Sequence, residues 1–329
     1  MNAFISLLAV GALVLAAIFG AGSAGLTGLF AIVIPYLAIA LFLFGFIYRI
    51  LSWAKCPVPF RIPTTAGQQK SLAWIPANNL EAPHNSSGVI RRMLLEILLF
   101  RSLFRNTRAE MKAGPRLVYG ADKWLWLAAI AFHYSFLMIF LRHLRFFTEP
   151  VPFFVAAIEN VDGFLQMAVP TVYVSTAVVV LALGFLLLRR FFNAQVRYVS
   201  LAADYFPLFL LLGVAISGII VRHFGKTDVV RIKELAMGLL SFSPRVPEDV
   251  GGQFYVHLFL VSALIAYFPF SKLMHLGGIF FSPTRNLANN NRAVRHVNPW
   301  NPEVKTHDFD HWAQEFKEEI AAAGYELKR

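Results

Sequence analysis

Four histidines lie in or beside two long apolar segments of this 329-residue chain. His133 and His143 belong to one segment, and His257 and His275 stand at the two ends of another, HLFLVSALIAYFPFSKLMH. An imidazole in hydrocarbon costs free energy unless it has a partner. No carboxylate lies in the middle of any apolar segment, so a proton relay or cation site of acidic residues lacks its ligands. Four neutral imidazoles among apolar helices suit haem b with histidine on both axial positions of the iron.

The single cysteine, Cys56, narrows the cofactors further. It excludes an internal disulfide, a c-type haem attached through CxxCH and a protein-ligated iron–sulfur cluster. A lone intramembrane histidine often serves only as a hydrogen-bonding residue between helices. Two histidines on each of two segments, at opposite depths, favour haem ligation instead.

The spacing predicts how the histidines pair. Eighteen residues make five full turns of an ideal helix, about 27 Å, so His257 and His275 should share one face. His133 and His143 should be about 15 Å apart and about 80° out of phase. Pro269 is expected to bend the later helix. If the two segments cross in opposite directions, His143 pairs with His257 and His133 with His275, and the two haems lie roughly 20 Å apart along the membrane normal.

The composition places these segments in a membrane. Hydrophobic residues make up 57% of the chain, charged residues only 15%, and the mean hydropathy is +0.58, whereas soluble domains carry about 25% charged residues. The first apolar segment lacks a basic n-region, and a second follows closely, so we expect a retained helix rather than a signal peptide. We predict an all-α fold, a polytopic membrane helix bundle with about six transmembrane helices. They should cover residues 3–20, 29–52, 124–147, 169–192, 204–224 and 254–272.

The distribution of basic residues predicts the orientation. Residues 49–123 carry 12 basic and 4 acidic residues, whereas residues 148–168 carry no basic residue and three acidic ones, Glu149, Glu159 and Asp162. The positive-inside rule then puts 49–123, 189–203 and the tail in the cytoplasm, and 148–168 and 225–252 outside. We expect the protein in the cytoplasmic (inner) membrane of a prokaryote, with both termini in the cytoplasm. The net charge of +11 sits mainly beside apolar runs, which disfavours a nucleic-acid-binding patch.

Four parts of the chain are expected. Residues 1–52 should form two N-terminal transmembrane helices, 53–123 a cytoplasmic loop, 124–281 a four-helix di-haem region, and 282–329 a cytoplasmic tail. The loop contains RRMLLEILLFRSLFRN, an amphipathic helix that lies on the membrane surface or against a partner, or is packed within its own cytoplasmic loop. The tail ends in a second amphipathic helix. His307 and His311 in the tail have the i,i+4 spacing of a metal pair, without an evident third ligand, and His84 and His296 should be surface residues.

The histidine spacing resembles a known family. Histidines ten apart on one span and eighteen apart on a later one, the latter enclosing FPFSKLMH, resemble the gamma-subunit family of respiratory nitrate reductase, five-helix di-haem cytochromes b. The resemblance covers roughly residues 120–280. The extra first helix, the 53–123 loop and the tail look more like the DsrM family, membrane cytochromes b of the sulfite reduction-associated Dsr complex, which are related to the membrane subunit of heterodisulfide reductase.

The resemblance implies a function. His133, His143, His257 and His275 would be the axial ligands of two b haems, the outer haem would exchange electrons with menaquinol, and the inner haem would serve a cytoplasmic iron–sulfur partner of the DsrK type in sulfate respiration. The chain would be the electron-transfer subunit of a quinol-dependent oxidoreductase complex. The quinone lysine of the nitrate reductase subunits has no counterpart here, because the loop after the first histidine helix contains no basic residue.

Polar residues gather where the outer helix ends should be. Arg142, Arg145 and Arg222 are candidates for binding haem propionates, because guanidinium binds carboxylate in a bidentate manner. His223 is the candidate hydrogen-bond partner and proton acceptor for a quinol, since its unperturbed pKa of about 6.5 lies near working pH. His223 could also serve as a helix C-cap. Tyr255 belongs to the same region.

Two other functional classes remain open. The chain could be a non-catalytic membrane anchor or assembly scaffold of a multi-subunit complex, in which the histidines only pack. A transporter is disfavoured, because neither a midspan charge nor an inverted repeat is evident.

Overall fold

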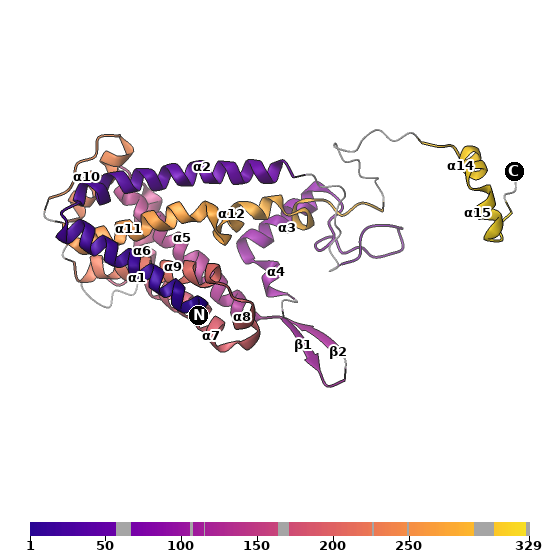
Figure 1. Ribbon diagram of the computed structural model, residues 1–329, viewed down its shortest axis with the longest axis horizontal. Coiled ribbons are helices and arrows are strands. Elements are labelled where there is room, and N and C mark those ends of the chain that lie inside the picture. The colour runs from indigo at the N-terminus through magenta and orange to yellow at the C-terminus, as the bar shows by residue number, and fades with distance from the viewer. Residues whose placement is uncertain are drawn as a thin grey trace.

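Six helices in the described part of the chain are long and apolar enough to cross a membrane. The computed structural model describes residues 1–56, 67–105, 108–114, 116–163, 171–225, 227–248, 250–292 and 306–326. The six helices form a bundle elongated along the helix axes (Figure 1). The candidate spans are Asn2–Ser23, Leu29–Ala54, Lys123–Phe146, Val174–Phe192, Ala202–His223 and Gly252–Phe270. They agree with the six segments expected from the sequence and confirm the all-α helical bundle.

Several spans combine more than one type of helix. The first consists of α1 (Asn2–Ala17) and a π-helical segment, η1 (Ile18–Ser23). The second consists of a π-helical segment, η2 (Leu29–Val33), and α2 (Ile34–Ala54). The third is α5 (Lys123–His143) with a 3-10 turn, η3 (Leu144–Phe146), and the fourth and fifth are α7 (Val174–Phe192) and α9 (Ala202–His223). The sixth is α11 (Gly252–Tyr267) with a 3-10 turn, η4 (Phe268–Phe270).

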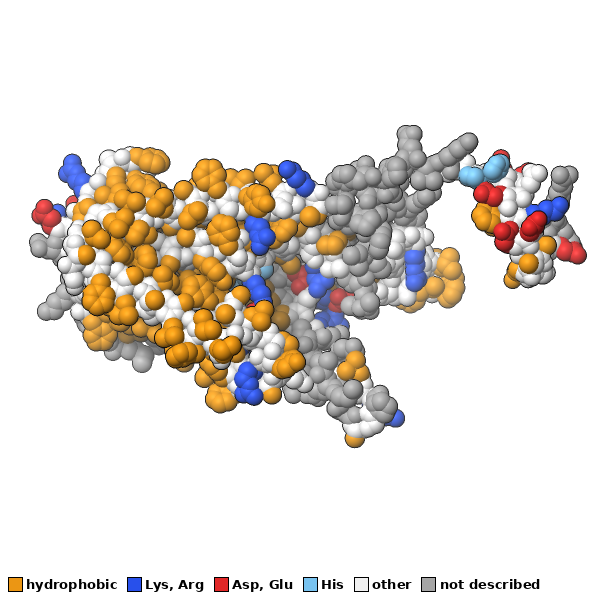
Figure 2. All heavy atoms as spheres, in the orientation of Figure 1, with side chains coloured by type: hydrophobic (Ala, Val, Ile, Leu, Met, Phe, Trp, Pro, Cys, Tyr) orange, Lys and Arg blue, Asp and Glu red, His pale blue; other side chains and the backbone are white. Residues whose placement is uncertain are grey.

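The outer surface of the bundle is apolar. Phe44 is 76% exposed and Leu181 73% exposed, although a soluble fold would bury such side chains. Figure 2 shows hydrophobic side chains over the bundle and charged ones toward its ends. A helix that is hydrophobic all round is typical of a membrane span, and here the lipid-facing side is as apolar as the core.

Two buried clusters hold the helices together. The first joins α1, α7, α9 and α11, and the second joins η1, η2, α11 and α10 (Val229–Leu240). Ala17 and Ala31 in the second cluster are fully buried, and such small residues allow membrane helices to approach closely. We call the end of the bundle at Asn2 the proximal end, and the end at Ser23 the distal end.

The connection between the second and third spans lies at the proximal end. It contains α3 (Ser86–Leu99), which Asn85 caps by accepting from the Gly88 amide, and the short α4 (Arg101–Phe104). It also contains a β-hairpin of two antiparallel strands, β1 (Arg108–Lys112) and β2 (Arg116–Gly120). The sequence pattern indicated the helix but not this hairpin, whose turn includes Gly114 at φ +78°.

Short helices complete the chain. At the distal end, α6 (Phe153–Asp162) and α10 occupy the two connections that the sequence pattern treated as loops. At the proximal end lie α8 (Ala194–Val199), the 3-10 turns η5 (Lys272–Met274) and η6 (Ile279–Phe281), α12 (His275–Gly278) and α13 (Pro283–Asn286). The expected amphipathic tail helix is divided into α14 (Phe309–Glu315) and α15 (Lys317–Ala322), which lie apart from the bundle in Figure 1.

Candidate functional site

The proximal end brings His133 and His275 together. His133 lies in the third turn of α5 and His275 is the first residue of α12. Their ring centres are 5.8 Å apart and the rings are inclined at 83°. This is close to the separation that one metal atom would require when bonded at about 2 Å to a nitrogen of each ring.

The distal end brings His143 and His257 together. His143 is the last residue of α5, and His257 lies in the second turn of α11. His257 packs against α9 through Gly218 and Ser217. Both pairs thus have the composition and the positions along the bundle that the sequence spacing predicted, one pair toward each end.

Each of the four rings is anchored through the same nitrogen. Nδ1 lies 2.7 Å from the Ala129 carbonyl in His133, 2.7 Å from the Ile139 carbonyl in His143, and 2.9 Å from the Lys272 carbonyl in His275. In His257, Nδ1 lies 2.9 Å from the Ser217 hydroxyl. A hydrogen bond at Nδ1 fixes the tautomer and orients the ring, which leaves Nε2 as the metal-binding nitrogen. The donor set therefore fits two bis-histidine haems.

The surroundings of the histidines also suit a large apolar ring system. Phe100 and Phe132 each lie 4.9 Å from the His133 ring, centre to centre, and nearly perpendicular to it. Phe100 has a left-handed backbone conformation, with φ 48°, which is rare for a bulky residue and is often found where a site requires it. At the distal end Gly218 lies against His257, and a Cβ at this position would come within 3.1 Å of the ring.

The segment between His257 and His275 differs from the ideal helix used to predict their phase. α11 ends at Tyr267, and Ser271 is extended, with φ −119° and ψ 176°. Pro269 lacks an amide hydrogen and cannot continue the helical ladder. The Arg49 side chain donates to the Pro269 carbonyl, and a Cβ at Gly45 would lie 2.7 Å from the proline ring, so α2 holds the break in place. The two histidines therefore lie on separate helices.

Three of the predicted site residues are arginines at the distal end, and two of them are paired with carboxylates of this chain. Arg142 is buried and forms an ion pair of 3.0 Å with the buried Asp162, and its guanidinium stacks on Tyr173 at 3.6 Å. Arg145 binds Glu159 at 2.6 Å. Asp162 and Glu159 belong to α6, which the sequence pattern did not reveal. Their pairing makes Arg142 and Arg145 poorer candidates for haem propionates than the sequence suggested.

The third arginine is placed differently. The Arg222 guanidinium donates to the Thr171 carbonyl through Nε at 3.3 Å and through Nη2 at 3.2 Å. It also lies over the Tyr173 ring, 4.5 Å from the ring centre. Its charge is not matched by a carboxylate in these contacts. His223, the candidate quinol partner, is half-buried as the last residue of α9.

Sequence reasoning missed several polar residues at the distal site. Ser175 accepts from Arg142 and donates to Asp162 at 2.6 Å, and its amide donates to the same carboxylate at 2.7 Å. Ser217 contacts His257. Serines within apolar segments are common and carry no spacing signal, so only the fold reveals these contacts.

The tail carries a separate cluster. His307, His311 and Glu315 are exposed, and one ligand atom from each lies within 4.8 Å of the others. Glu315 is thus the third ligand that the sequence interpretation lacked for His307 and His311, and its i,i+4 spacing from His311 could have indicated it.

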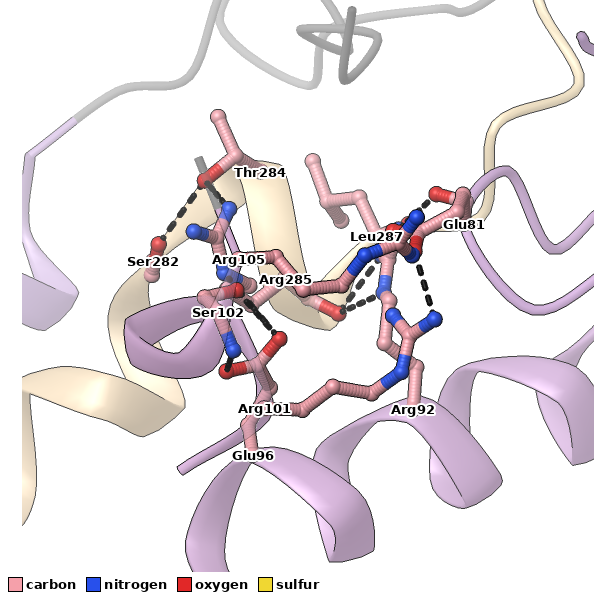
Figure 3. Close-up of polar contacts among 10 residues, drawn as sticks. All are labelled: Glu81, Arg92, Glu96, Arg101, Ser102, Arg105, Ser282, Thr284, Arg285 and Leu287. Atoms are coloured by element: carbon pink, nitrogen blue, oxygen red, sulfur yellow. Dashed lines mark hydrogen bonds and ion pairs between the residues drawn. The ribbon is translucent and has the colours of Figure 1, made fainter. Parts of the chain in front are cut away.

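A polar cluster, drawn in Figure 3, joins several segments at the proximal end. Arg92 of α3 is only 2% exposed and donates to the main-chain carbonyls of Glu81, Arg285 and Leu287 at 2.7 to 3.2 Å. These bonds tie the 67–83 segment, α3 and α13 into one unit. The main chain at the end of α3 is also fixed to α5, because Trp126 donates to the Leu99 carbonyl at 2.7 Å.

Glu81 is the acidic centre of this cluster. Its carboxylate binds Arg101 at 2.6 Å and also binds Arg105. Burial alone raises the pKa of Glu81, but the hydrogen bond and charge of Arg101, with the charges of Arg105 and Arg92, outweigh it and lower the pKa. Glu81 is therefore ionised at neutral pH. Of the positions that the sequence left open for α3, packing within its own loop fits the face that carries the buried Arg92.

Comparison with known proteins agrees with this geometry. Residues 97–297 match the family model described as nitrate reductase gamma subunit. The chain is 47% identical over 281 residues to an Hdr-like menaquinol oxidoreductase cytochrome b-like subunit of Archaeoglobus fulgidus, covering 83% of this chain and 84% of the relative. It is 42% identical over 278 residues to the protein of the same description from Archaeoglobus profundus, covering 82% of each. The chain, a multi-pass membrane protein, therefore belongs to the nitrate reductase gamma subunit family of cytochromes b.

Proposed function

We propose that this chain is the di-haem membrane subunit of a respiratory complex, and that it carries electrons between menaquinol and an iron–sulfur partner. The observation that carries the proposal is the pair of histidines at each end of the bundle, with every Nδ1 already anchored. The names of the two relatives, which specify a cytochrome b-like subunit of a menaquinol oxidoreductase, support it.

In this proposal His143 and His257 hold the distal b haem, and His133 and His275 hold the proximal one. Bound haem would supply one-electron oxidation and reduction at each end of the bundle. The protein residues fix the imidazoles through their Nδ1 hydrogen bonds, and the apolar helices exclude water from the path between the two sites.

The proposed orientation places the proximal end in the cytoplasm of a prokaryotic cell, with both termini there and the distal end outside. The arginines and lysines of the α2–α5 connection support it through the positive-inside rule. The partner would then be a cytoplasmic iron–sulfur subunit of the DsrK type, docked on the 53–123 loop and the 282–329 tail. The function in sulfate respiration belongs to the same proposal, as does the division into residues 1–52, 53–123, 124–281 and 282–329.

Oxidation of menaquinol at the distal end releases two electrons and two protons, so this end needs a proton acceptor and a route to water. His223 is the proposed acceptor, because it stands at the distal end of α9. Arg222 is the arginine best suited to a haem propionate, because its present contacts are to a carbonyl and a tyrosine ring.

The alternative is a membrane anchor or scaffold that holds a complex together without transferring electrons. Replacing single histidines separates the two functions. Haem content and optical spectra would be measured on purified His143→Ala, His257→Ala, His133→Ala and His275→Ala variants. The proposal predicts that the first two lose the distal haem and the last two the proximal haem. Unaltered protein without haem would favour the scaffold.

The partner can be tested by crosslinking in intact membranes. Lys272 lies at the proximal end, where its ammonium binds Asp204 at 2.6 Å and remains largely exposed. Lys233 on α10, at the distal end, is the control; it is also paired with a carboxylate, Glu149, and its side chain is 25% exposed. Crosslinks from Lys272 should reach a cytoplasmic iron–sulfur protein, and crosslinks from Lys233 should not. The reverse result would contradict the proposed orientation.

A further inference from the structure

A cavity opens at the distal end on the side of α11 that bears Gln253 and Val256. Its volume is about 600 Å³, which falls within the range typical of small-molecule sites. Three elements form it: α1 with η1, α9 and α11. The residues that line it include Val14, Ile18, Gly22, Ser217, Ile220 and Val256.

Ser217 connects this cavity to the distal histidine pair. It lines the cavity, it is only 7% exposed, and its hydroxyl lies 2.9 Å from Nδ1 of His257. If Nε2 of His257 binds iron, Nδ1 carries the hydrogen and donates it to the Ser217 oxygen. The serine hydroxyl can then donate to the Val214 carbonyl, 3.0 Å away, or to a ligand in the cavity. A ligand here would be one hydrogen-bonded residue away from a haem ligand.

The wall formed by the first span has an unusual backbone. Ile18–Ser23 forms a π-helical segment, a conformation that is rare and is found frequently at functional sites. Gly22 lies in this segment and has no heavy atom within 4 Å of where a Cβ would stand, so it leaves open space at the cavity. Gln253 contributes another polar side chain, oriented by a 3.2 Å bond from its Nε2 to the Gly225 carbonyl.

We infer that this cavity is the menaquinol site, with the quinol ring held between η1 and α11 and one quinol hydroxyl bonded to Ser217. The inference rests on the proposed function and specifies where its substrate binds. The mainly apolar lining suits a naphthoquinol ring and its isoprenoid tail, and Ser217 and Gln253 provide the polar contacts. Residues 14–23 lie outside the matched range 97–297, so this wall belongs to the part of the chain that the family model does not cover.

The redox step balances with the haem as the oxidant. One quinol loses two electrons and two protons and becomes a quinone, while its two O–H bonds break and two C=O bonds form. The two electrons would pass one at a time toward the b haem that His143 and His257 would hold, and the iron–sulfur partner would oxidise that haem again. The two protons would leave toward the distal end of the bundle.

Photolabelling tests the site without relying on turnover. Membranes that contain the full chain would be treated with an azido-naphthoquinone, with and without excess short-chain menaquinone, and labelled peptides would be identified by mass spectrometry. The label should fall within residues 14–23 or 252–256 and should be displaced by menaquinone. Gly22→Leu should reduce labelling by about tenfold, equivalent to about 1.4 kcal/mol, because the leucine side chain would occupy space in which we place the quinol ring.

Gly11→Leu is the matched control. Gly11 also lies in the first span, and a Cβ added there would likewise meet no atom within 4 Å, but Gly11 does not line the cavity. Labelling in this variant should equal that of unaltered protein. Three results would each overturn the inference. The first is equal labelling in Gly22→Leu, and the second is label found only around Arg222 and His223. The third is label that menaquinone does not displace, as expected if a lipid chain fills the cavity.

A second measurement separates this inference from the proposed function. Menaquinol should reduce the haems of unaltered protein. If it does so while labelling and reduction are unchanged in Gly22→Leu, the function stands and the site lies elsewhere. If menaquinol reduces no haem in unaltered protein, the proposed function fails and the inference fails with it.

Discussion

Replacing Gly218 by alanine should weaken the distal haem and leave the proximal one unchanged. A Cβ at this position would lie 3.1 Å from Cε1 and 3.6 Å from Nδ1 of the His257 imidazole. Carbon atoms in contact are normally about 3.5–4.0 Å apart, so the ring must move by a few tenths of an ångström. Overpacking of this kind costs about 1–3 kcal/mol, and a middle value corresponds to more than tenfold weaker haem binding at the distal site.

The assay would be optical and EPR spectroscopy of the purified variant, together with haem content. The signals of the distal haem should shift or diminish, and those of the proximal haem should not. Gly218→Val, which adds two further methyl groups, should abolish distal binding. Gly213→Ala on the same helix is the control, because its Cβ would meet Leu260 and Val10 at an ordinary 3.5 Å. Unchanged distal signals in both Gly218 variants would refute the placement of a haem at His257.

Three further predictions concern the surroundings of the two sites. Asp162→Asn should destabilise the chain by about 3 kcal/mol, measured as a lowered Tm, because it leaves Arg142 buried without its counter-charge. The control is Glu149→Gln, at an exposed pair with Lys233, which should change the stability by less than about 1 kcal/mol. His223→Ala should slow haem reduction by menaquinol about tenfold while both haems are retained, because the proposed acceptor for protons that leave the quinol at the distal end is lost. An unchanged rate would leave His223 as a helix cap. Folding lowers the pKa of Glu81, so the stability that its charge provides is present above the unfolded pKa of about 4.3 and is lost as the pH falls through the lower folded pKa. The protease sensitivity of residues 67–105 should therefore rise only below about pH 4. A rise between pH 7 and pH 5 would contradict this.

The six spans could be predicted well, because twenty apolar residues in a row have few alternatives to a membrane helix. The pairing of the histidines could also be predicted, since opposite crossing directions place residues at equal depth together. The common helix face expected for His257 and His275 was less accurate, because Pro269 ends the helix and the chain reaches α12 through 3-10 turns.

Other features were beyond sequence reasoning for a physical reason. The arginine environment depends on α6, a ten-residue helix whose side chains Glu159 and Asp162 return to the end of α5. A short connection of this kind gives no strong periodic signal. Likewise Ser217 acquires a role only when α9 packs beside α11, and the cavity next to it depends on the contact of α1 with both helices.

The central claim is that each chain holds two b haems between its histidine pairs. The most direct test is a pyridine haemochrome measurement of haem per chain on purified protein. We expect two haems b per chain, falling to one in His257→Ala and to one in His133→Ala. Absence of haem b from the purified protein, or two haems retained in both variants, would contradict it.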